Sequence, residues 1–248
     1  MNLVDLLLIL PAAGFLLTLA APVQNARAAR IMALAFSLVT LVLSLGMAAP
    51  VWSAGADRYF VTDIQWVATP SIRYHVAVDG LSLWLVILTA LLTPICVLIS
   101  WNAIQDRVKE FHAFLLLLEC GLIGVFVAQD LFLFYVFWEV SLVPMYFLIG
   151  IWGHGRRIYA AVKFFLFTMA GSVLMLAAII YLYNQAGTFD YRVLMEYMNS
   201  GRLVLSRSQQ LVLFLAFFIA FAIKVPLFPP GPRSSGGSPR FSSRKTYS

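Results

Sequence analysis

Charged residues are scarce in this chain of 248 residues: only 11% are Asp, Glu, Lys or Arg, while 62% are hydrophobic. A soluble domain has about 25% charged and about 45–50% apolar residues. The composition therefore excludes a water-soluble globular protein and predicts an integral membrane protein. The remaining charges are mostly basic, 17 Lys and Arg against 11 Asp and Glu. They cluster between apolar runs rather than along one face, so we interpret them as loop residues and expect no nucleic-acid partner.

Cysteines and metal-ligand motifs are also few. Cys96 and Cys120 each lie inside an apolar run, far from a CxxC spacing, and are interpreted as small buried hydrophobic residues. The three histidines lie in or beside loops, without a spacing that suits a metal ion. No phosphate-binding loop and no helical repeat are present. The sequence thus offers no candidate metal or cofactor site.

Apolar runs long enough to cross a bilayer recur along the chain. The first carries Asp5 near its start and no Lys or Arg, so it lacks the basic region of a signal peptide and is predicted to be a retained helix. Together the runs predict an all-α membrane protein of about seven transmembrane helices, over residues 3–21, 31–47, 81–100, 111–128, 131–151, 158–183 and 211–227.

The polar intervals between these runs predict the connections. Residues 48–78 are expected to form an extramembrane loop with possible short strands, and residues 184–210 can include a short helix along the membrane surface. Only Gln129 and Asp130 separate the fourth and fifth spans, which predicts a tight antiparallel hairpin of helices. The connections after spans one, three and five are the most basic per residue, so we expect them in the cytoplasm and the N-terminus outside.

Three ionisable residues lie well inside apolar spans: Glu119, Glu139 and Lys224. Placing a charge at that depth costs at least about 2.5 kcal/mol on insertion scales, so each needs a partner, water or a function. Pro144 follows Glu139 by five residues and Pro226 follows Lys224 by two. Because proline has no N–H, each leaves one helical carbonyl without its donor. Both charges are therefore expected beside a helix break where a polar group can enter.

An acid and a lysine in a low-dielectric site can exchange protons, and when they lie within about 4–6 Å each holds the other charged. Such an acid–lysine pair is the smallest set of groups that a proton relay needs. Alternative readings remain for each residue. Either glutamate can be a neutral residue that joins two helices by hydrogen bonds, and Lys224 is near enough to the end of its span to extend to the interface. The prolines can be packing kinks.

Three stretches carry a resemblance to a known family. They are FLLLLECGLIGVFVAQDLFLFYVFWEVSLVPMYFLIGIWG, RRIYAAVKFFLFTMAGSVLML and FLAFFIAFAIKVPLFP, with VDGLSLWLVILTALLTP further upstream. They closely resemble subunit M of bacterial NADH-quinone oxidoreductase, respiratory complex I, whose mitochondrial counterpart is NADH dehydrogenase chain 4. The similarity covers nearly everything up to Pro229.

The resemblance implies an antiporter-like, proton-translocating subunit in the bacterial inner membrane, built from inverted helical repeats. Glu139 matches the family's fifth-helix glutamate and Lys224 its seventh-helix lysine, which together form a charge pair. Glu119 matches a fourth-helix glutamate of lesser weight and Lys163 a sixth-helix basic position. The implied partners are the other membrane subunits of complex I. NADH, FMN, iron–sulfur clusters and quinone are expected on other parts of the complex, with no cofactor on this chain.

The chain departs from the family after Phe228, where members continue with roughly half the protein again. Residues 229–248 are rich in Pro, Gly, Ser and Arg, predict a disordered tail, and suggest a frameshift or truncated gene model. Resequencing across the codons for Pro229 tests this. A chain truncated there is expected not to pump. The alternatives are a subunit of a multisubunit sodium/proton antiporter, in which the ion specificity differs, and a non-conducting membrane remnant.

Overall fold

The computed structural model describes residues 2–21, 25–53 and 59–225. Within this part, seven helices are long and apolar enough to cross a membrane. They are α1 (Leu3–Ala20), α2 (Ala26–Gly46), α4 (Gly80–Ala103), α5 (Val108–Val127), α6 (Leu131–Trp152), α7 (Arg157–Ala186) and α9 (Arg207–Lys224). The prediction of an all-α membrane protein with about seven spans is confirmed. The expected tail at 229–248 and the predicted helix break at Pro226 lie outside the described residues.

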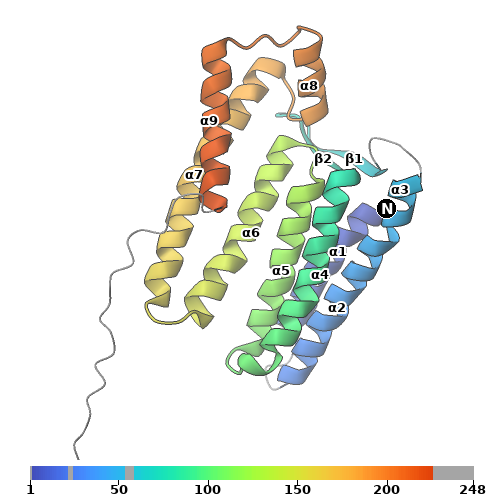
Figure 1. The fold of residues 1–248 in the computed structure, drawn as a ribbon, viewed down its shortest axis with the longest axis vertical. Coiled ribbons are helices and arrows are strands. Elements are labelled where there is room, and N and C mark those ends of the chain that lie inside the picture. Colours follow the sequence, from blue (N-terminus) through green and yellow to red (C-terminus); the bar gives the residue numbers. More distant parts are fainter. Residues whose placement is uncertain (1, 22–24, 54–58, 226–248) are drawn as a thin grey trace, which may run out of the picture.

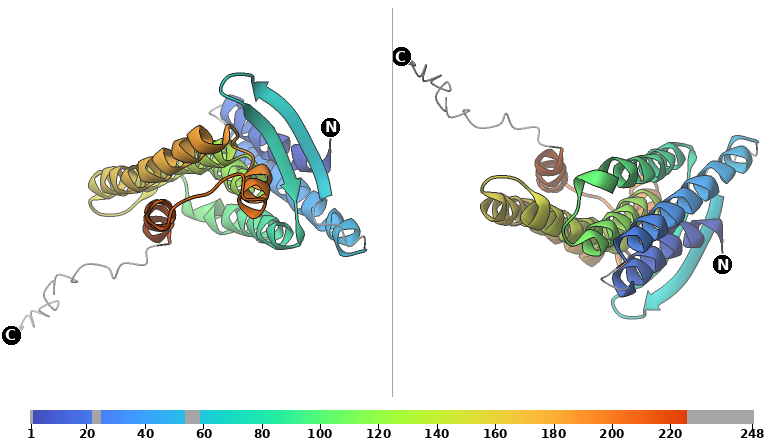
Figure 2. Two further views of the ribbon diagram at one scale, coloured as in Figure 1. Left: turned by 90° about the horizontal axis from the view of Figure 1, so that it is seen from above. Right: turned by 90° about the horizontal axis from the view of Figure 1, so that it is seen from below.

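The long helices form two groups that share the α5–α6 hairpin (Figures 1 and 2). Helices α1, α2, α4 and α5 pack together as a cluster, and α6, α7 and α9 extend from it in a row. Helix α7 packs along α6, whereas α9 ends about halfway along α6 (Figure 1). The last residue of α9 therefore lies at mid-depth of the bundle rather than at one of its ends.

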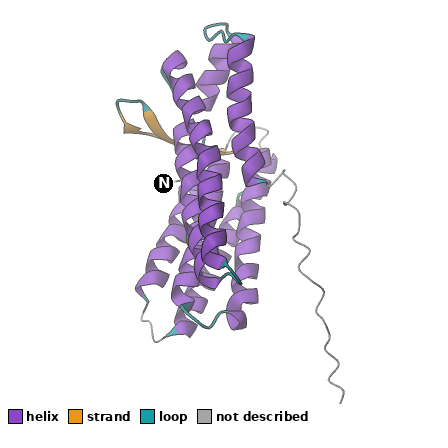
Figure 3. Cartoon of the chain, turned by 90° about the vertical axis from the view of Figure 1, so that its left-hand side faces the viewer, coloured by secondary structure: helices purple, strands orange, loops and turns teal. Residues whose placement is uncertain are grey.

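The extramembrane connections contain the remaining elements. The short helix α3 (Ala48–Ser53) precedes the antiparallel strands β1 (Tyr59–Val67) and β2 (Ile72–Val78), and α8 (Tyr191–Asn199) lies between α7 and α9. The strand pair projects sideways near one end of the helices (Figure 3). A polar interval with possible short strands was expected there, and the structure contains them. Helix α8 lies at the height of the upper part of α9 but apart from it (Figures 1 and 2), and of its residues Leu194 is buried.

Aspartates determine where three helices begin. Asp79, Asp130 and Asp190 precede α4, α6 and α8, and each accepts hydrogen bonds from two backbone N–H groups of the following first turn. These N–H groups have no partner inside the helix, so a capping carboxylate satisfies them and favours the positive end of the helix dipole. Polar residues at span ends thus serve as caps.

The opposite end of the bundle is basic. Helix α2 begins at Ala26 rather than at the predicted residue 31, so Arg27 and Arg30 lie in its first turns. Arg30 donates from Nη2 to the carbonyl of Ile104 at 2.9 Å. The Lys109 amine lies 3.3 Å from the carbonyl of Leu19. The residues used to predict the cytoplasmic side therefore gather at one end, although the membrane side that they face stays a prediction.

Two glycines allow helices to approach closely at the middle of the bundle. A Cβ on Gly121 of α5 would lie 3.0 Å from the backbone nitrogen of Ser141 on α6, and one on Gly171 of α7 would lie 2.7 Å from Cδ1 of Ile223 on α9. Small residues let transmembrane helices pack backbone to backbone. Both contacts lie close in sequence to the charged residues of α6 and α9.

Gly121→Leu is expected to destabilise the protein by about 1–3 kcal/mol, because the added side chain meets the α6 backbone, which cannot rotate away. Thermal unfolding of the purified chain in detergent measures the effect. Gly46→Leu is the matched control, since nothing lies within 4 Å of a Cβ at that position. Equal unfolding temperatures for the two variants would contradict the close approach of α5 and α6.

Candidate functional site

Glu119 and Glu139 lie at the same depth in neighbouring helices. Glu119 is eight residues from the end of α5, and Glu139 is eight residues from the start of the antiparallel α6. At 1.5 Å per residue, each lies about 12 Å from the hairpin end. The tight connection predicted from the sequence therefore places both acids in the middle of their helices, far from either end.

Lys224 reaches α6 at nearly the same depth. Its amine donates to the Ser141 hydroxyl at 2.9 Å and lies 4.4 Å from the ring centroid of Trp138. Ser141 is the eleventh of the 22 residues of α6. The lysine side chain is therefore directed into the helix bundle, not toward the membrane interface, which was the alternative reading of its position.

Glu139 lies near this lysine without contacting it. The Glu139 carboxylate acts electrostatically on the Lys224 amine, but within residues 2–21, 25–53 and 59–225 no ion pair with N···O of 4.0 Å or less joins them. Its Oε1 atom is buried without a hydrogen-bond partner among the described residues. The structure thus brings the predicted partners together in one region, with the lysine bound to Ser141 and Trp138.

The predicted helix break at Pro144 needs a correction. Helix α6 is assigned as one uninterrupted helix from Leu131 to Trp152, with Pro144 inside it. A proline removes one backbone hydrogen bond, but packing against neighbouring helices can hold the helix together across the gap. Pro144 therefore leaves a carbonyl without its donor but does not end the helix.

Glu119 occupies a separate position. Its side chain is 1% exposed, and neither carboxylate oxygen has a hydrogen-bond partner of acceptable geometry in the described part of the chain. Thr93 of α4 lies close enough to act on it, but the Thr93 hydroxyl donates to the carbonyl of Thr89 at 3.1 Å. Glu119 thus faces α4, away from Lys224.

Lys163, the predicted sixth-helix basic position, is exposed on α7.

A buried pair that the sequence did not reveal joins the strand pair to α8. His75 Nδ1 and Asp190 Oδ2 are 2.6 Å apart, and both residues are buried. The backbone adds hydrogen bonds from Gln129 to the carbonyl of His75 at 2.8 Å and from Tyr191 to the carbonyl of Gln129 at 3.0 Å. We call this group of contacts the outer junction. It connects β2, the α5–α6 turn and the start of α8.

The electrostatics of the outer junction differ between its two buried aspartates. Burial favours a higher pKa for Asp190, but hydrogen bonds from His75 and from two α8 N–H groups outweigh it and leave the pKa below the ordinary value. Burial raises the pKa of Asp130, and its backbone hydrogen bonds only partly offset this. The two pKa values are therefore shifted in opposite directions, and Asp190 is the more acidic aspartate of the junction.

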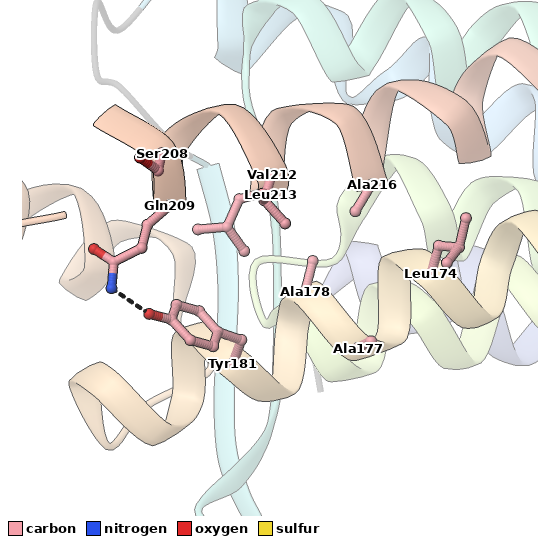
Figure 4. A pocket seen from close by; sticks show the side chains of 9 residues that line it. All are labelled: Leu174, Ala177, Ala178, Tyr181, Ser208, Gln209, Val212, Leu213 and Ala216. Carbon is pink, nitrogen blue, oxygen red and sulfur yellow. Dashed lines mark hydrogen bonds between the residues drawn. The ribbon is translucent and has the colours of Figure 1, made fainter. Parts of the chain in front are cut away.

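An apolar groove of about 440 Å³ is lined by residues of α7 and α9. Figure 4 shows alanine and leucine side chains along it, with Gln209 donating to the Tyr181 hydroxyl at 2.6 Å at one end. No ionisable group except the Tyr181 phenol lines it. The groove therefore lies outside the group of membrane charges.

Comparison with known proteins first defines the class. Residues 128–230 match the family described as NADH:quinone oxidoreductase/Mrp antiporter, TM. This range includes Glu139, Lys224 and both helices that hold them. Residues 128–230 are thus similar to a membrane-spanning part of antiporter-like subunits.

The particular relatives are subunits of complex I. The chain is 43% identical to NADH-quinone oxidoreductase subunit M of Rhodobacter capsulatus over 82% of this chain and 40% of the relative. It is 39% identical to NADH-ubiquinone oxidoreductase chain 4 of Arabidopsis thaliana, over 90% of this chain and 44% of the relative. Respiratory complex I from Thermus thermophilus with bound NADH contains a chain that superposes with a TM-score of 0.76 at 29% identity, over 91% of this chain and 44% of that one.

These findings confirm the resemblance to subunit M and chain 4. The chain spans less than half of the length of the curated relatives it matches. Its seven apolar helices make it a multi-pass membrane protein.

Asp190→Asn is expected to remove a pH-dependent part of the stability. Because the native pKa of Asp190 is depressed, its ionised form stabilises the fold above its unfolded pKa of about 3.9, and that stabilisation is lost as the pH falls through the lower native value. Unfolding temperatures in detergent from pH 7 down to pH 3 should therefore fall more steeply for the wild type than for the variant.

Asparagine also caps helices well, so this variant keeps the start of α8 and removes only the charge. Asp130 is present in both proteins, and its raised pKa should fall in the variant because the charge of Asp190 contributes to it. Parallel pH profiles for the two proteins would contradict the assigned role of Asp190.

Proposed function

We propose that this chain is the first half of a proton-translocating membrane subunit of NADH-quinone oxidoreductase. The observation that supports this best is the position of Lys224, whose helix ends at mid-bundle and whose amine lies on α6 within electrostatic reach of Glu139. The relatives named subunit M and chain 4 give the complex in which such a pair would act.

The proposed chemistry needs only the movement of one ammonium group. When Lys224 approaches Glu139, the carboxylate is held ionised, because an opposite charge at short range favours the charged form of both groups. When the lysine withdraws, the half-buried carboxylate loses that compensation and can accept a proton. Alternation between these arrangements takes up and releases a proton at mid-helix, and conformational change elsewhere in the complex would drive it.

We further infer that the redox groups reside on other subunits. NADH, FMN, the iron–sulfur clusters and quinone would bind elsewhere, and the partners of this chain would be the other membrane subunits in the bacterial inner membrane. The charged residues of the remaining half would continue the path, since the matched relatives are more than twice as long as the aligned region.

Glu139→Gln and Lys224→Met are each expected to lower proton pumping at least about tenfold, because neither variant retains both members of the pair. Pumping is measured in membrane vesicles by a pH-sensitive dye during NADH oxidation, in complex I carrying the full-length subunit. Assembly is checked by native gel. Undiminished pumping by fully assembled Glu139→Gln complex would remove this pair from the path, whereas loss of pumping with normal assembly would exclude an inert membrane remnant.

Glu119→Gln should reduce pumping by less than about threefold, because Glu119 faces α4 and exchanges no hydrogen bond with a charged residue. The same vesicle assay applies. A loss as large as that of Glu139→Gln would instead place Glu119 on the main path.

The matched family also includes Mrp antiporters, which keeps a sodium/proton antiporter subunit as the second candidate. Sodium dependence of the vesicle assay separates the two. Pumping driven by NADH without sodium supports the oxidoreductase, while sodium-driven proton exchange without NADH supports the antiporter. Neighbouring genes for flavin and iron–sulfur subunits would also favour the oxidoreductase.

A further inference from the structure

The Lys224 amine is held by two groups that carry no charge. It donates to the Ser141 hydroxyl at 2.9 Å and lies 4.4 Å from the centroid of the Trp138 ring. A cation over an indole face gains about 0.5–1 kcal/mol at exposed sites and about 2 kcal/mol or more when desolvated. Together, the hydroxyl and the ring form a docking position for an ammonium group that needs no acid.

Ser141 is oriented to accept this hydrogen bond. Its own hydroxyl donates to the carbonyl of Trp138 at 2.7 Å, so its lone pairs remain for the lysine. Ser141 is 1% exposed and Trp138 is 4% exposed. Gly121 lets α5 press against the Ser141 backbone, and the Trp138 ring meets Phe221 edge-on at 5.0 Å. The docking position is therefore built into the packing of three helices.

The acid two residues earlier has an unused oxygen. Glu139 Oε1 is buried without a hydrogen-bond partner among the described residues, although it lies within electrostatic range of the lysine. An unpartnered buried carboxylate oxygen is costly, so it marks a place where a cation or a proton can bind. Glu139 is thus a second acceptor on α6, near the ammonium group that Ser141 binds in this structure.

We propose that Ser141, with the face of Trp138, is a positioning site that holds the Lys224 ammonium away from Glu139, so that the lysine alternates between Ser141 and Glu139. The assignment of the movement to proton translocation rests on the proposed function, but the docking position itself does not. A neutral acceptor suits this role, because it holds the lysine without competing for the proton of Glu139. It also offers the ammonium group another acceptor, so that the proposed ion pair between Lys224 and Glu139 can open.

The docking position is tested first without any pumping assay. The emission of Trp138 is isolated in the purified 248-residue chain as the difference between the wild type and Trp138→Phe, since the chain has 6 tryptophans. Ser141→Ala and Lys224→Met should both shift this difference spectrum, because each removes the ammonium from the indole face. Ser141→Thr, which keeps the hydroxyl, should retain the wild-type spectrum.

Ser37→Ala is the matched control, since Ser37 is also buried, donates to a carbonyl three residues earlier at 3.1 Å, and lies on α2 far from Lys224. It should leave the Trp138 spectrum unchanged. A spectrum that responds to Lys224→Met but not to Ser141→Ala would overturn the role of Ser141, and one that responds to neither would overturn the docking position.

The second test measures the pH dependence of proton pumping in the complex with the full-length subunit. Ser141→Ala should lower the maximal rate roughly two- to tenfold, the effect of one lost hydrogen bond. It should also move the acid limb of the profile to lower pH, because a carboxylate that keeps its lysine longer is harder to protonate. Ser141→Thr should restore both properties, and Ser37→Ala should alter neither.

The two ideas fail in different ways. If Glu139→Gln stops pumping but Ser141→Ala has the wild-type rate and pH profile, the alternation is wrong and the proposed function stands. If Glu139→Gln pumps normally while the Trp138 spectrum shifts in Ser141→Ala as expected, the proposed function is wrong and the docking position stands. A lower rate with an unmoved acid limb would show that Ser141 has only a structural role.

Discussion

The hydrogen bond from Lys224 to Ser141 is the contact on which the interpretation of this chain depends. A lysine at the middle of an apolar helix bundle is costly, and the cost falls only when the amine finds an acceptor, a ring face or a carboxylate. Here the amine has the first two, and the carboxylate is close by. Each of these groups lowers the cost of keeping the amine at this depth, so the proposed movement passes from one stabilised position to another.

The rest of the fold places that amine at the right depth. Helix α9 packs mainly on α7, where Gly171 permits close approach at Ile223. Its starting point depends on the connection that runs through α8, and the outer junction attaches this connection to β2 and to the α5–α6 turn. Because Asp130 of the same junction caps α6, one cluster of polar contacts sets the height of both helices that carry the charge pair.

The sequence predicted the parts of this arrangement that have a local signal. Apolar runs of sufficient length predicted the seven spans, and the short connection at Gln129 and Asp130 predicted the hairpin that brings Glu119 and Glu139 to one depth. The strands and the basic end also follow from local composition. The predicted start of α2 was too late. Arg27 and Arg30 were interpreted as loop residues, but they lie in the first turns of the helix.

Contacts between distant residues had no such signal. His75 and Asp190 are 115 positions apart, and an isolated histidine in a polar interval gives no indication of a buried partner. Lys224 was paired with Glu139 by charge and by the family resemblance, and a single serine such as Ser141 in an apolar run gave no signal of its own. The break at Pro144 was inferred from the missing N–H, but the packing of α5 and α7 on α6 keeps the helix continuous.

The continuity of α6 changes what its proline contributes. Pro144 cannot donate to the carbonyl of Val140, and Val140 lies between Glu139 and Ser141. An intact helix therefore presents, within three consecutive residues, a carboxylate, a carbonyl without its helical donor and a hydroxyl. Each of these groups can accept a hydrogen bond from an ammonium group, so the path from Ser141 to Glu139 need not cross purely apolar surface. Because successive residues of a helix are about 100° apart around its axis, these three acceptors follow the surface of α6 from the side of Ser141 to the side of Glu139.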